Sequence, residues 1–349
     1  MTHRFPIKEI ARQAALGPAT VDRVLNNRAH VSPQTRARVR AAIAELEGQE
    51  AQLSARGRRL FFDVVIEAPT RFSREVQAAT EAILPQIGSA VCRPRFVMQE
   101  IMDAPEVIAT LDRILKRGSH GVCLKARDTR AIRAAVDRLA KAGIPVVTLV
   151  TDIAAPARAA YVGLDNAGAG RTAAFLVAKA VGAQAGAVLA TRSHERFLGE
   201  EERMDAFATR LATLAPDLRL VRVEGGSGLG VDTSRVLEPE MAALADLRAV
   251  YSMGGGNRSI LSVLEDHGLR PDVFVAHDLD QDNRDLLAQG RLDFVLHHDL
   301  RHDMRQAFDQ FLEHHNLVPP AGAVAVSTVD VVTPANIPPA VKRAGVPMR

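Results

Sequence analysis

The sequence predicts an all-α head of roughly 60 residues, followed by an α/β body built on parallel sheets. The chain has 349 residues, more than the roughly 100–200 residues of a typical single domain. Its composition is 47% hydrophobic but only 4% aromatic, which suits cores of Ala, Val, Leu and Ile. From Phe61 onward, short β-branched runs alternate with amphipathic helical segments, whereas the residues before Phe61 show helical spacing only.

Charge is distributed unevenly along the chain, whose net charge is +3. Residues 1–60 hold 11 Lys or Arg residues and five Asp or Glu residues, a net charge of +6, so the rest carries −3. A basic segment of this kind can meet a polyanion. We therefore expect the head, and not the body, to contact nucleic acid.

Two cysteines without regular spacing, Cys92 and Cys123, indicate neither a disulfide framework nor a zinc ribbon. The N-terminus is not followed by an apolar signal-peptide core, and no stretch approaches the roughly 20 apolar residues of a membrane span. We expect a cytoplasmic protein that binds no cofactor and no metal.

The first two helices of the head are separated by a turn at Gly17. Ile7, Ile10 and Ala14 recur at helical spacing, so this segment forms a short amphipathic helix. Pro18 suits the first position of a second helix, since proline lacks the N–H that this position leaves unpaired. The apolar stripe of the second helix consists of Val21, Val24 and Leu25.

A third helix begins at Ser32 and Pro33, which suit the N-cap and first positions. Its buried face is expected at Val39, Ile43 and Leu46. Two short helices joined by a glycine turn, with a third in support, indicate a helix-turn-helix whose second helix enters the major groove of DNA. A three-helix bundle with a solvated arginine face is the alternative, but the turn, caps and charge together favour DNA binding.

These three segments resemble the lac-repressor/gal-repressor family. Residues 7–14 are similar to its first helix, residues 19–26 to its "ATVSRVLN" recognition helix and residues 31–39 to its "VSPETRxRV" third helix. The resemblance implies a regulator of transcription, most simply a repressor, that acts as a homodimer or larger even assembly on a pseudo-palindromic operator. It also implies a periplasmic-binding-protein-like body of type I, with two doubly wound parallel-sheet lobes and a small-molecule effector between them.

The resemblance also assigns the residues that contact DNA, with departures at three positions. Asp22 replaces the usual serine, and its carboxylate is repulsive near phosphates. Pro18 has no side-chain donor, so we expect Arg23 to bond a guanine edge. Gly57 or Arg58 stands where the family inserts a hinge leucine into the minor groove, which predicts weaker DNA kinking. A shifted wedge at Leu53 and a flexible basic linker remain alternatives. The expected DNA-contacting residues are Pro18, Ala19, Thr20, Arg23, Asn26, Ser32, Arg36, Arg56 and Arg58.

The expected organisation is a head over residues 1–48, a hinge or linker over 49–60 and an effector-binding body over 61–340. Three chain crossovers between the two lobes are expected near Asp165, Asp280 and Ser327. They assign residues 61–165 and 281–326 to the first lobe, and residues 166–280 and 327–340 to the second. The strands of the body are expected at 62–66, 95–98, 121–124, 145–149, 186–190, 218–223, 249–252, 273–276 and 294–296.

Ligands of such sheets bind beyond the carboxyl ends of the strands, which predicts the lining of the cleft. Carboxylate, amide and guanidinium groups bind hydroxyl pairs, and an aromatic ring packs on the apolar face of a sugar, so we expect a sugar or polyol. A carboxylate after a strand, such as Asp152 or Asp278, alternatively only caps the next helix. The expected ligand-binding residues are Arg71, Phe72, Ser73, Asp152, Arg203, Asn257, Asp278 and His298.

Other motifs in the chain carry little weight. Gly168–Ala173 fits the dinucleotide pattern G-x-G-x-x-A, but we interpret its small residues as close helix packing. The histidines at 297, 298 and 302 lack the remaining features of a zinc site. No P-loop and no G-x-S-x-G motif is present, so nucleotide hydrolysis and serine-hydrolase chemistry have no support, and a sugar-modifying enzyme with a DNA-binding head is the less favoured alternative. Sensing of a purine or of a partner protein remains the alternative to a carbohydrate effector.

Overall fold

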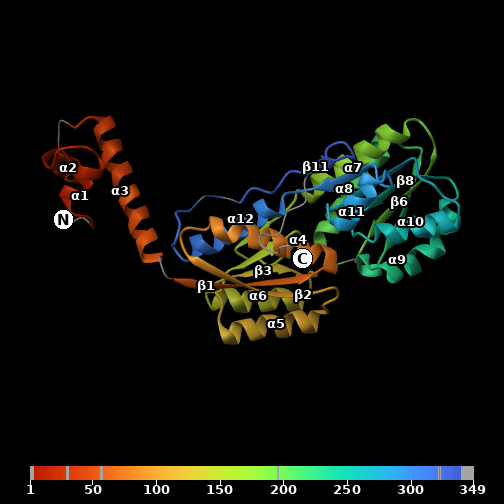
Figure 1. Ribbon diagram of the computed structural model, residues 1–349, viewed down its shortest axis with the longest axis horizontal. Coiled ribbons are helices and arrows are strands. Elements are labelled where there is room, and N and C mark those ends of the chain that lie inside the picture. The colour runs from red at the N-terminus through yellow and green to blue at the C-terminus, as the bar shows by residue number, and fades with distance from the viewer. Residues whose placement is uncertain are drawn as a thin grey trace, which may run out of the picture. The chain divides into compact units, whose positions relative to one another are not determined.

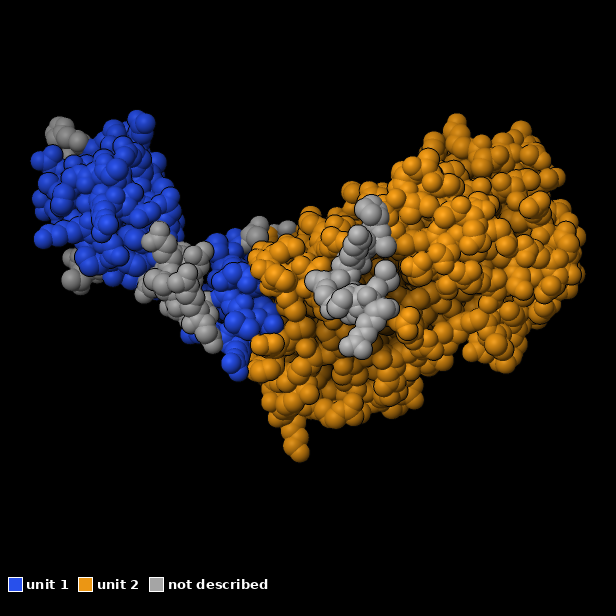
Figure 2. Space-filling view, in the orientation of Figure 1, with its two compact units in different colours: residues 1–60, 87–92, 312–321 blue, residues 61–86, 93–311, 322–349 orange. Residues whose placement is uncertain are grey.

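The computed structural model describes residues 4–28, 31–55, 58–194, 196–320, 322 and 324–338, with side chains left undescribed between residues 48 and 55. The chain divides into two compact units, shown in Figure 2. Unit 1 comprises residues 1–60, 87–92 and 312–321, and unit 2 comprises the remainder. In the described part of the chain, no helix is both long and apolar enough to cross a membrane.

Unit 1 contains the three helices of the head, α1 (Ile7–Gln13), α2 (Pro18–Leu25) and α3 (Pro33–Ala55). Pro18 lies in the first turn of α2, directly after the extended Gly17. The helices enclose a small core in which all the residues of the predicted apolar faces take part. Its members are Phe5, Ile7, Ile10, Ala11, Ala14, Leu16, Val21, Val24, Leu25, Val39, Ala42, Ile43 and Leu46.

Helix α3 is longer than the sequence predicts, because its backbone stays helical to Ala55. The segment from Gln49 to Ala55, expected as the first part of a linker, consists mostly of good helix formers and contains no proline. Gly48 follows Leu46 but does not end the helix, since good helix formers continue after it. Arg56 and Gly57 of the predicted hinge lie outside the described residues.

Unit 2 is built on two sheets, each the centre of a lobe (Figure 1). In the first sheet the strand order is β2-β1-β3-β4-β5, and the pairings from β1 to β5 are parallel. Its strands are β1 (Arg59–Glu67), β2 (Val91–Gln99), β3 (Val122–Lys125), β4 (Val146–Leu149) and β5 (Ala160–Val162).

The second sheet has the order β11-β10-β9-β8-β6-β7 and is parallel except for β11. The short strand β11 (Asp330–Val332) pairs antiparallel with β10 and is not among the strands that the sequence predicts. The remaining strands are β6 (Gly186–Arg192), β7 (Leu218–Glu224), β8 (Leu247–Ser252), β9 (Val273–His277) and β10 (Phe294–His297).

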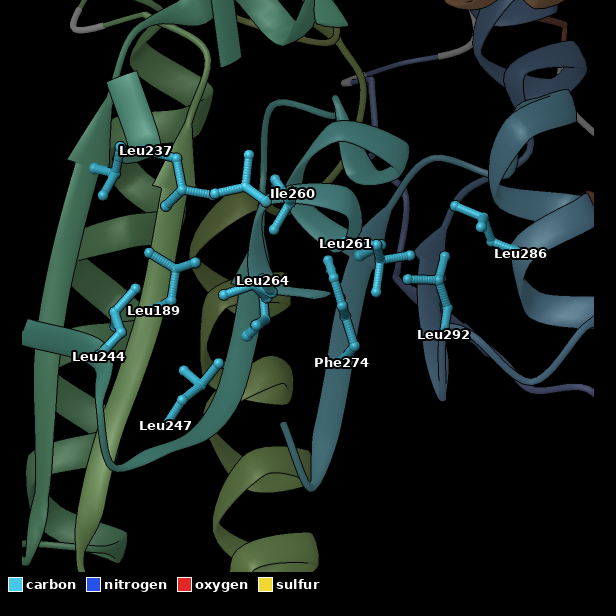
Figure 3. Close-up of a cluster of buried hydrophobic side chains, with 14 of the residues drawn as sticks. Leu189, Leu237, Leu244, Leu247, Ile260, Leu261, Leu264, Phe274, Leu286 and Leu292 are labelled. Atoms are coloured by element: carbon cyan, nitrogen blue, oxygen red, sulfur yellow. The ribbon is translucent and has the colours of Figure 1, made fainter. Parts of the chain in front are cut away.

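Helices cover both faces of each sheet. In the first lobe, α5 (Ala104–Arg117) and α6 (Arg130–Lys141) pack on one face, and α4 (Thr70–Ile83) and α12 (Leu300–His314) lie on the other (Figure 1). In the second lobe, α7 (Asn166–Val181) and α8 (Leu198–Leu214) share one core. The opposite core, shown in Figure 3, is built from α9 (Gly230–Leu237), α10 (Asn257–Asp266), α11 (Gln281–Ala288) and the strands beneath them.

The chain crosses between the lobes after β5, after β10 and before β11. The second crossover was expected near Asp280, and this is wrong, because β10 pairs in parallel with β9 and so belongs to the second sheet. The lobe boundary therefore follows His297. At the first and third crossovers, Leu164 and Ser327 form an isolated parallel bridge. The first and third crossing segments therefore run side by side.

The glycine pattern in α7 has a packing role. A Cβ at Gly170 would lie 2.3 Å from the carbonyl oxygen of Arg203 in α8, so only glycine permits this approach of the two helices. This contact agrees with the interpretation of the G-x-G-x-x-A motif as close helix packing. Among the described residues, no group of three or more His, Cys, Asp or Glu side chains is arranged to hold a metal ion.

Candidate functional site

A cleft opens where the carboxyl ends of the strands of the two lobes face each other. It encloses an empty volume of about 720 Å³, including solvent at its mouth. The position follows from the fold, because loops that leave the carboxyl ends of parallel strands converge there. From the first lobe it is lined by Glu67, Ala68, Pro69, Arg71, Phe72, Glu100, Lys125, Val150 and Thr151. From the second it is lined by Ser193, Phe197, Gly199, Glu200, Arg203, Ser227, Met253, Gly254, Gly255, His277, Asp278 and Asp280.

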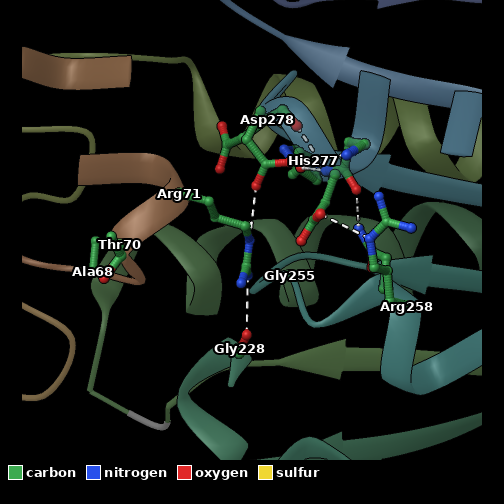
Figure 4. Close-up of polar contacts among 12 residues, drawn as sticks. Ala68, Thr70, Arg71, Gly228, Gly255, Arg258, His277 and Asp278 are labelled. Atoms are coloured by element: carbon green, nitrogen blue, oxygen red, sulfur yellow. Dashed lines mark hydrogen bonds and ion pairs between the residues drawn. The ribbon is translucent and has the colours of Figure 1, made fainter. Parts of the chain in front are cut away.

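Arg71 joins the two lobes across the cleft (Figure 4). Its Cα lies in the first turn of α4, and its Nε lies 2.8 Å from Asp280 Oδ2 of the second lobe. Its Nη2 donates to the carbonyl oxygen of Gly228, also in the second lobe, over 3.0 Å. A Cβ at Gly255 would meet the guanidinium at 2.3 Å, so the glycine loop after β8 leaves space for this side chain.

Asp280 is buried and has an unusual proton affinity. Its Oδ1 caps α11 by accepting from the Asn283 N–H at 2.9 Å. Burial raises the pKa of this carboxyl to about 6, although the cap and the Arg71 guanidinium act in the opposite direction. Asp280 therefore changes charge close to physiological pH, at the contact that joins the lobes.

Lys125 lies at the end of β3, deep in the cleft. Its Nζ donates to the carbonyl oxygen of Glu67 over 2.8 Å and lies 4.1 Å from the centre of the Phe197 ring in the second lobe. Burial lowers the pKa of this ammonium, while Glu200, Glu67 and Asp278 act to raise it. Carboxylates from both lobes balance its charge, so Lys125 links the two walls of the site electrostatically.

Arg203 occupies the floor of the second lobe and is 3% exposed. Its Nε donates to Asn166 Oδ1 over 2.7 Å, and the amide of Asn166 donates to the Tyr161 hydroxyl over 3.0 Å. Tyr161 in turn donates to the carbonyl oxygen of Leu164. This chain of hydrogen bonds leads from the cleft to the first crossover.

Two hydrogen bonds join the other two crossovers to each other. His298 Nε2 lies 4.0 Å from Asp278 Oδ1, and its Nδ1 lies 2.6 Å from Asp303 Oδ2. The other oxygen of Asp303 accepts from the Ser327 hydroxyl over 2.6 Å. The fully buried Asp303 carboxylate therefore joins the second crossover, at His298, to the third crossover, at Ser327.

Half of the predicted ligand-binding residues line the cleft, namely Arg71, Phe72, Arg203 and Asp278. Ser73, in the first turn of α4, instead donates to the carbonyl oxygen of Ala68, and Asp152 pairs with Arg158 beside Thr148. Asn257 is buried at the start of α10, where it donates to Asn283. His298 lies behind Asp278, as described above. The residues of the lining that the prediction lacks include Glu67, Lys125, Thr151, Ser193, Phe197, Glu200, Met253, His277 and Asp280.

Some of these omissions follow a signal that the sequence contains. Thr151 directly precedes Asp152 after the same strand, and its Oγ1 accepts from the Gly199 N–H of the second lobe over 3.1 Å. Glu67 and Lys125 are charged residues in the last positions of β1 and β3, at the edge where ligands bind. A search for charged residues in the last strand position would have found both.

The head presents a set of exposed residues on α2. Pro18, Ala19, Arg23 and Asn26 are exposed and Thr20 is half-buried, whereas Val21 is fully buried against the other helices. The turn before α2 is fixed from α3, because Arg38 Nη2 donates to the carbonyl oxygen of Ala14 over 2.8 Å. The positive φ of this turn, 50°, falls on Ala15, whereas Gly17 is extended, so the turn does not use the conformational freedom of the glycine.

Asp22 is less repulsive than its sequence position implies, because two neighbours compensate its carboxylate. Asn26 donates to Asp22 Oδ1 over 2.8 Å, and Arg28 lies 3.5 Å from Oδ2. Ser32 caps α3 by accepting from the Thr35 N–H over 3.1 Å. Arg36 Nη1 donates to Asn27 Oδ1 over 3.1 Å and so holds the end of α2. Of the predicted hinge contacts, Arg58 is exposed and Arg56 lies outside the described residues.

Two family models match the chain. One, described as "Periplasmic binding protein domain", matches residues 70–316, and the other, described as "Bacterial regulatory proteins, lacI family", matches residues 6–47. The chain belongs to the periplasmic binding protein family and carries a lacI-family head. The lacI-family segment spans α1, α2 and the first half of α3, and the periplasmic binding protein domain contains nearly the entire cleft.

Relatives of known identity match shorter stretches. The HTH-type transcriptional regulator TreR of Escherichia coli (strain K12) is 36% identical over 119 residues, which cover 34% of this chain and 37% of that protein. TreR of Salmonella typhimurium is 35% identical over 127 residues, which cover 36% of this chain and 39% of that protein. The matched region thus spans less than half the length of these relatives.

Solved structures with the same architecture cover most of the periplasmic binding protein domain. GanP, a glucose-galactose binding protein from Geobacillus stearothermophilus, matches with a TM-score of 0.71 and 18% identity over 80% of this chain and 99% of its own. An ABC transporter solute binding protein from Burkholderia graminis C4D1M, in complex with D-arabinose, matches with a TM-score of 0.70 and 19% identity over 79% of this chain and 96% of its own. At this identity the likeness shows the fold.

Proposed function

We propose that this protein is a sequence-specific DNA-binding regulator of transcription, most simply a repressor, controlled by a small carbohydrate or polyol in its cleft. The observation that carries the proposal is the combination, in one chain, of a lacI-family head with a cleft whose polar lining comes from both lobes. The head supplies an exposed reading surface on α2, and the body supplies a ligand site connected to a hinge.

The effector assignment is supported by the chemistry of the cleft and by its solved neighbours. Hydroxyl groups are bound by carboxylates, amides and guanidinium groups, and the cleft offers Glu67, Asp278 and Arg203. Phe72 and Phe197 offer apolar faces against which a sugar ring packs. The neighbours are named for binding glucose, galactose and D-arabinose.

Control of DNA binding follows from the connection between cleft and hinge. A ligand that contacts both lobes changes their relative orientation, because it binds one orientation better than the other. Asn166 links Arg203 of the lining to the first crossover, and Asp303 links the second crossover to the third, so the change is expected to reach the hinge. We propose a homodimer, acting in the cytoplasm on a pseudo-palindromic operator with half-sites about one helical turn apart.

DNA selection tests the proposal. The full chain is incubated with a random DNA pool, and bound sequences are recovered, with enrichment of a two-fold symmetric site expected. Arg23→Ala is expected to lose roughly 1–3 kcal/mol of discrimination at one base pair of each half-site. Arg40→Ala, at an exposed arginine of α3, serves as the control and is expected to weaken binding equally for all sequences. Recovery of no enriched sequence from the pool contradicts the proposal.

A further inference from the structure

Glu67 presents an unpartnered acceptor on the wall of the cleft. The residue is 3% exposed, and its Oε1 receives both the Nε and the Nη2 of Arg127. Its Oε2 is buried and has no hydrogen-bond partner among the described residues. Leaving such an atom unpaired costs about 1–3 kcal/mol, so a group that pairs with it gains that amount on binding. A carboxylate oxygen accepts, so this group has to bring an O–H or N–H.

His277 presents a second unpartnered atom. Its Nε2 lies 2.7 Å from the Tyr251 hydroxyl, whereas its Nδ1 is buried and has no partner in the described part of the chain. Burial, reinforced by the charges of Arg203 and His298, holds the pKa of His277 well below its usual value. The imidazole is therefore neutral at pH 7, and it offers a hydrogen bond to a hydroxyl but no charge to an anion.

The cations that line the cleft are already bound by acceptors of the protein. Arg71 is held by Asp280 and Gly228, and Lys125 by the carbonyl oxygen of Glu67. Arg203 donates to Asn166 and to the carbonyl oxygen of Met253. Each cation keeps further N–H donors, because a guanidinium carries five and an ammonium three, so it is the charge balance of the lining that decides against an anionic ligand.

The lining also contains more carboxylates than cations. Its five carboxylate side chains face three cationic ones, and counting Arg127 behind Glu67 leaves the excess in place. Repulsion between an anionic ligand and these groups is stronger in the cleft than in water, because the local dielectric constant is lower. The carboxylates belong to Glu67, Glu100, Glu200, Asp278 and Asp280, and the cations to Arg71, Lys125 and Arg203.

We propose that the cleft selects an uncharged polyhydroxylated ligand, one hydroxyl of which donates to Glu67 Oε2, and rejects phosphorylated and carboxylated derivatives of the same molecule. The inference rests on the proposed function, because it specifies the effector of that same cleft. It makes Glu67 the residue that determines specificity, with Arg127 as the residue that orients it.

Matched pairs of ligands test the selectivity on the full chain. Thermal unfolding is measured with D-glucose, D-galactose, D-arabinose and myo-inositol, and with the phosphate ester of each. Because a ligand that binds only the folded state raises the melting temperature, an uncharged member is expected to raise it and its phosphate to leave it unchanged.

The outcomes separate the inference from the function it rests on. If a phosphate ester raises the melting temperature and its parent does not, the inference is overturned while a carbohydrate effector stands. If neither series has any effect, the inference fails together with the carbohydrate effector. Selection of an operator from random DNA is independent of both results.

Substitution tests the role of Glu67 with the ligand found in that screen. Glu67→Gln keeps the shape but replaces one acceptor by an NH₂ donor, so the Kd from calorimetry is expected to rise about 10- to 100-fold. Glu81→Gln is the matched control, because Glu81 is an exposed glutamate of α4 that accepts from Gln77 and is not among the lining residues named above. A less than twofold change is expected for the control. Equal effects of the two substitutions would overturn the assignment, and the ligand pairs decide the selectivity even if Glu67→Gln does not fold.

Discussion

The burial of Asp280 in the cleft predicts that the stability of the protein depends on pH. The carboxyl is 4% exposed, and its pKa is raised to about 6 by burial. An unfolded aspartate has a pKa of about 3.9, so the folded chain holds this proton more tightly than the unfolded chain does. The stability that this group contributes is fully present below pH 4 and is lost as the pH rises through about 6.

The size of this loss follows from the difference of about two pKa units, each worth about 1.4 kcal/mol. At pH 7 the ionised Asp280 therefore reduces the free energy of unfolding by about 2–3 kcal/mol relative to its protonated form. Asp280→Asn removes the charge, and its amide oxygen still caps α11 in place of the carboxylate. We expect this variant to unfold at higher urea concentration than the parent at pH 7, and at a similar concentration at pH 4.

Urea unfolding followed by circular dichroism between pH 4 and pH 8 measures the effect. Asp282→Asn is the matched control, because Asp282 lies in the first turn of the same helix but is paired at the surface with Arg258. Its stability change is expected to stay within about 0.5 kcal/mol. If Asp280→Asn were less stable than the parent at pH 7, or kept the parent's pH dependence, the argument from burial would be refuted.

Two further predictions concern packing and the hinge. Gly170→Ala is expected to destabilise the body by about 1–3 kcal/mol, because its Cβ would meet the Arg203 carbonyl oxygen. Gly88→Ala is the control and is expected to cost little, because the space around Gly88 is open. Urea unfolding of both variants measures the difference, and equal stabilities would contradict the prediction. Asp303→Asn is expected to lower the free energy of unfolding by about 1.5–3 kcal/mol. The amide keeps one acceptor oxygen but replaces the other by an NH₂ donor, so the hydrogen bond to either His298 or Ser327 is lost. Calorimetric unfolding checks this cost, and an unchanged melting temperature would show that the carboxylate does not hold the hinge.

The head could be predicted closely because its signals are local. The apolar spacing of α1 to α3, Pro18 at the start of α2 and Ser32 as a cap each act within a few residues. The end of α3 could not be predicted in the same way, because Gly48, the first helix-weakening signal after Leu46, lies inside the helix, and no proline follows it before Ala55.

In the body, local signals predict the strands but not which strands pair with each other. All nine predicted strands are present, because β-branched runs identify a strand. The sheet to which a strand belongs depends on pairing with distant residues, so the sequence places β10 in the first lobe, whereas its pairing with β9 puts it in the second. The same limit applies to the cleft, where Asp278 and Asp280 lie two residues apart and both line the wall, yet only Asp280 reaches Arg71.

The central claim, that occupancy of the cleft controls DNA binding by the head, is tested most directly by one titration. The full chain is titrated onto its selected operator by fluorescence anisotropy, with and without the uncharged ligand that raises its melting temperature. Coupling between two sites is commonly worth about 1–3 kcal/mol, so a change of about 5- to 150-fold in the Kd for DNA is expected. An identical Kd for the operator with the cleft saturated and with it empty would contradict the claim.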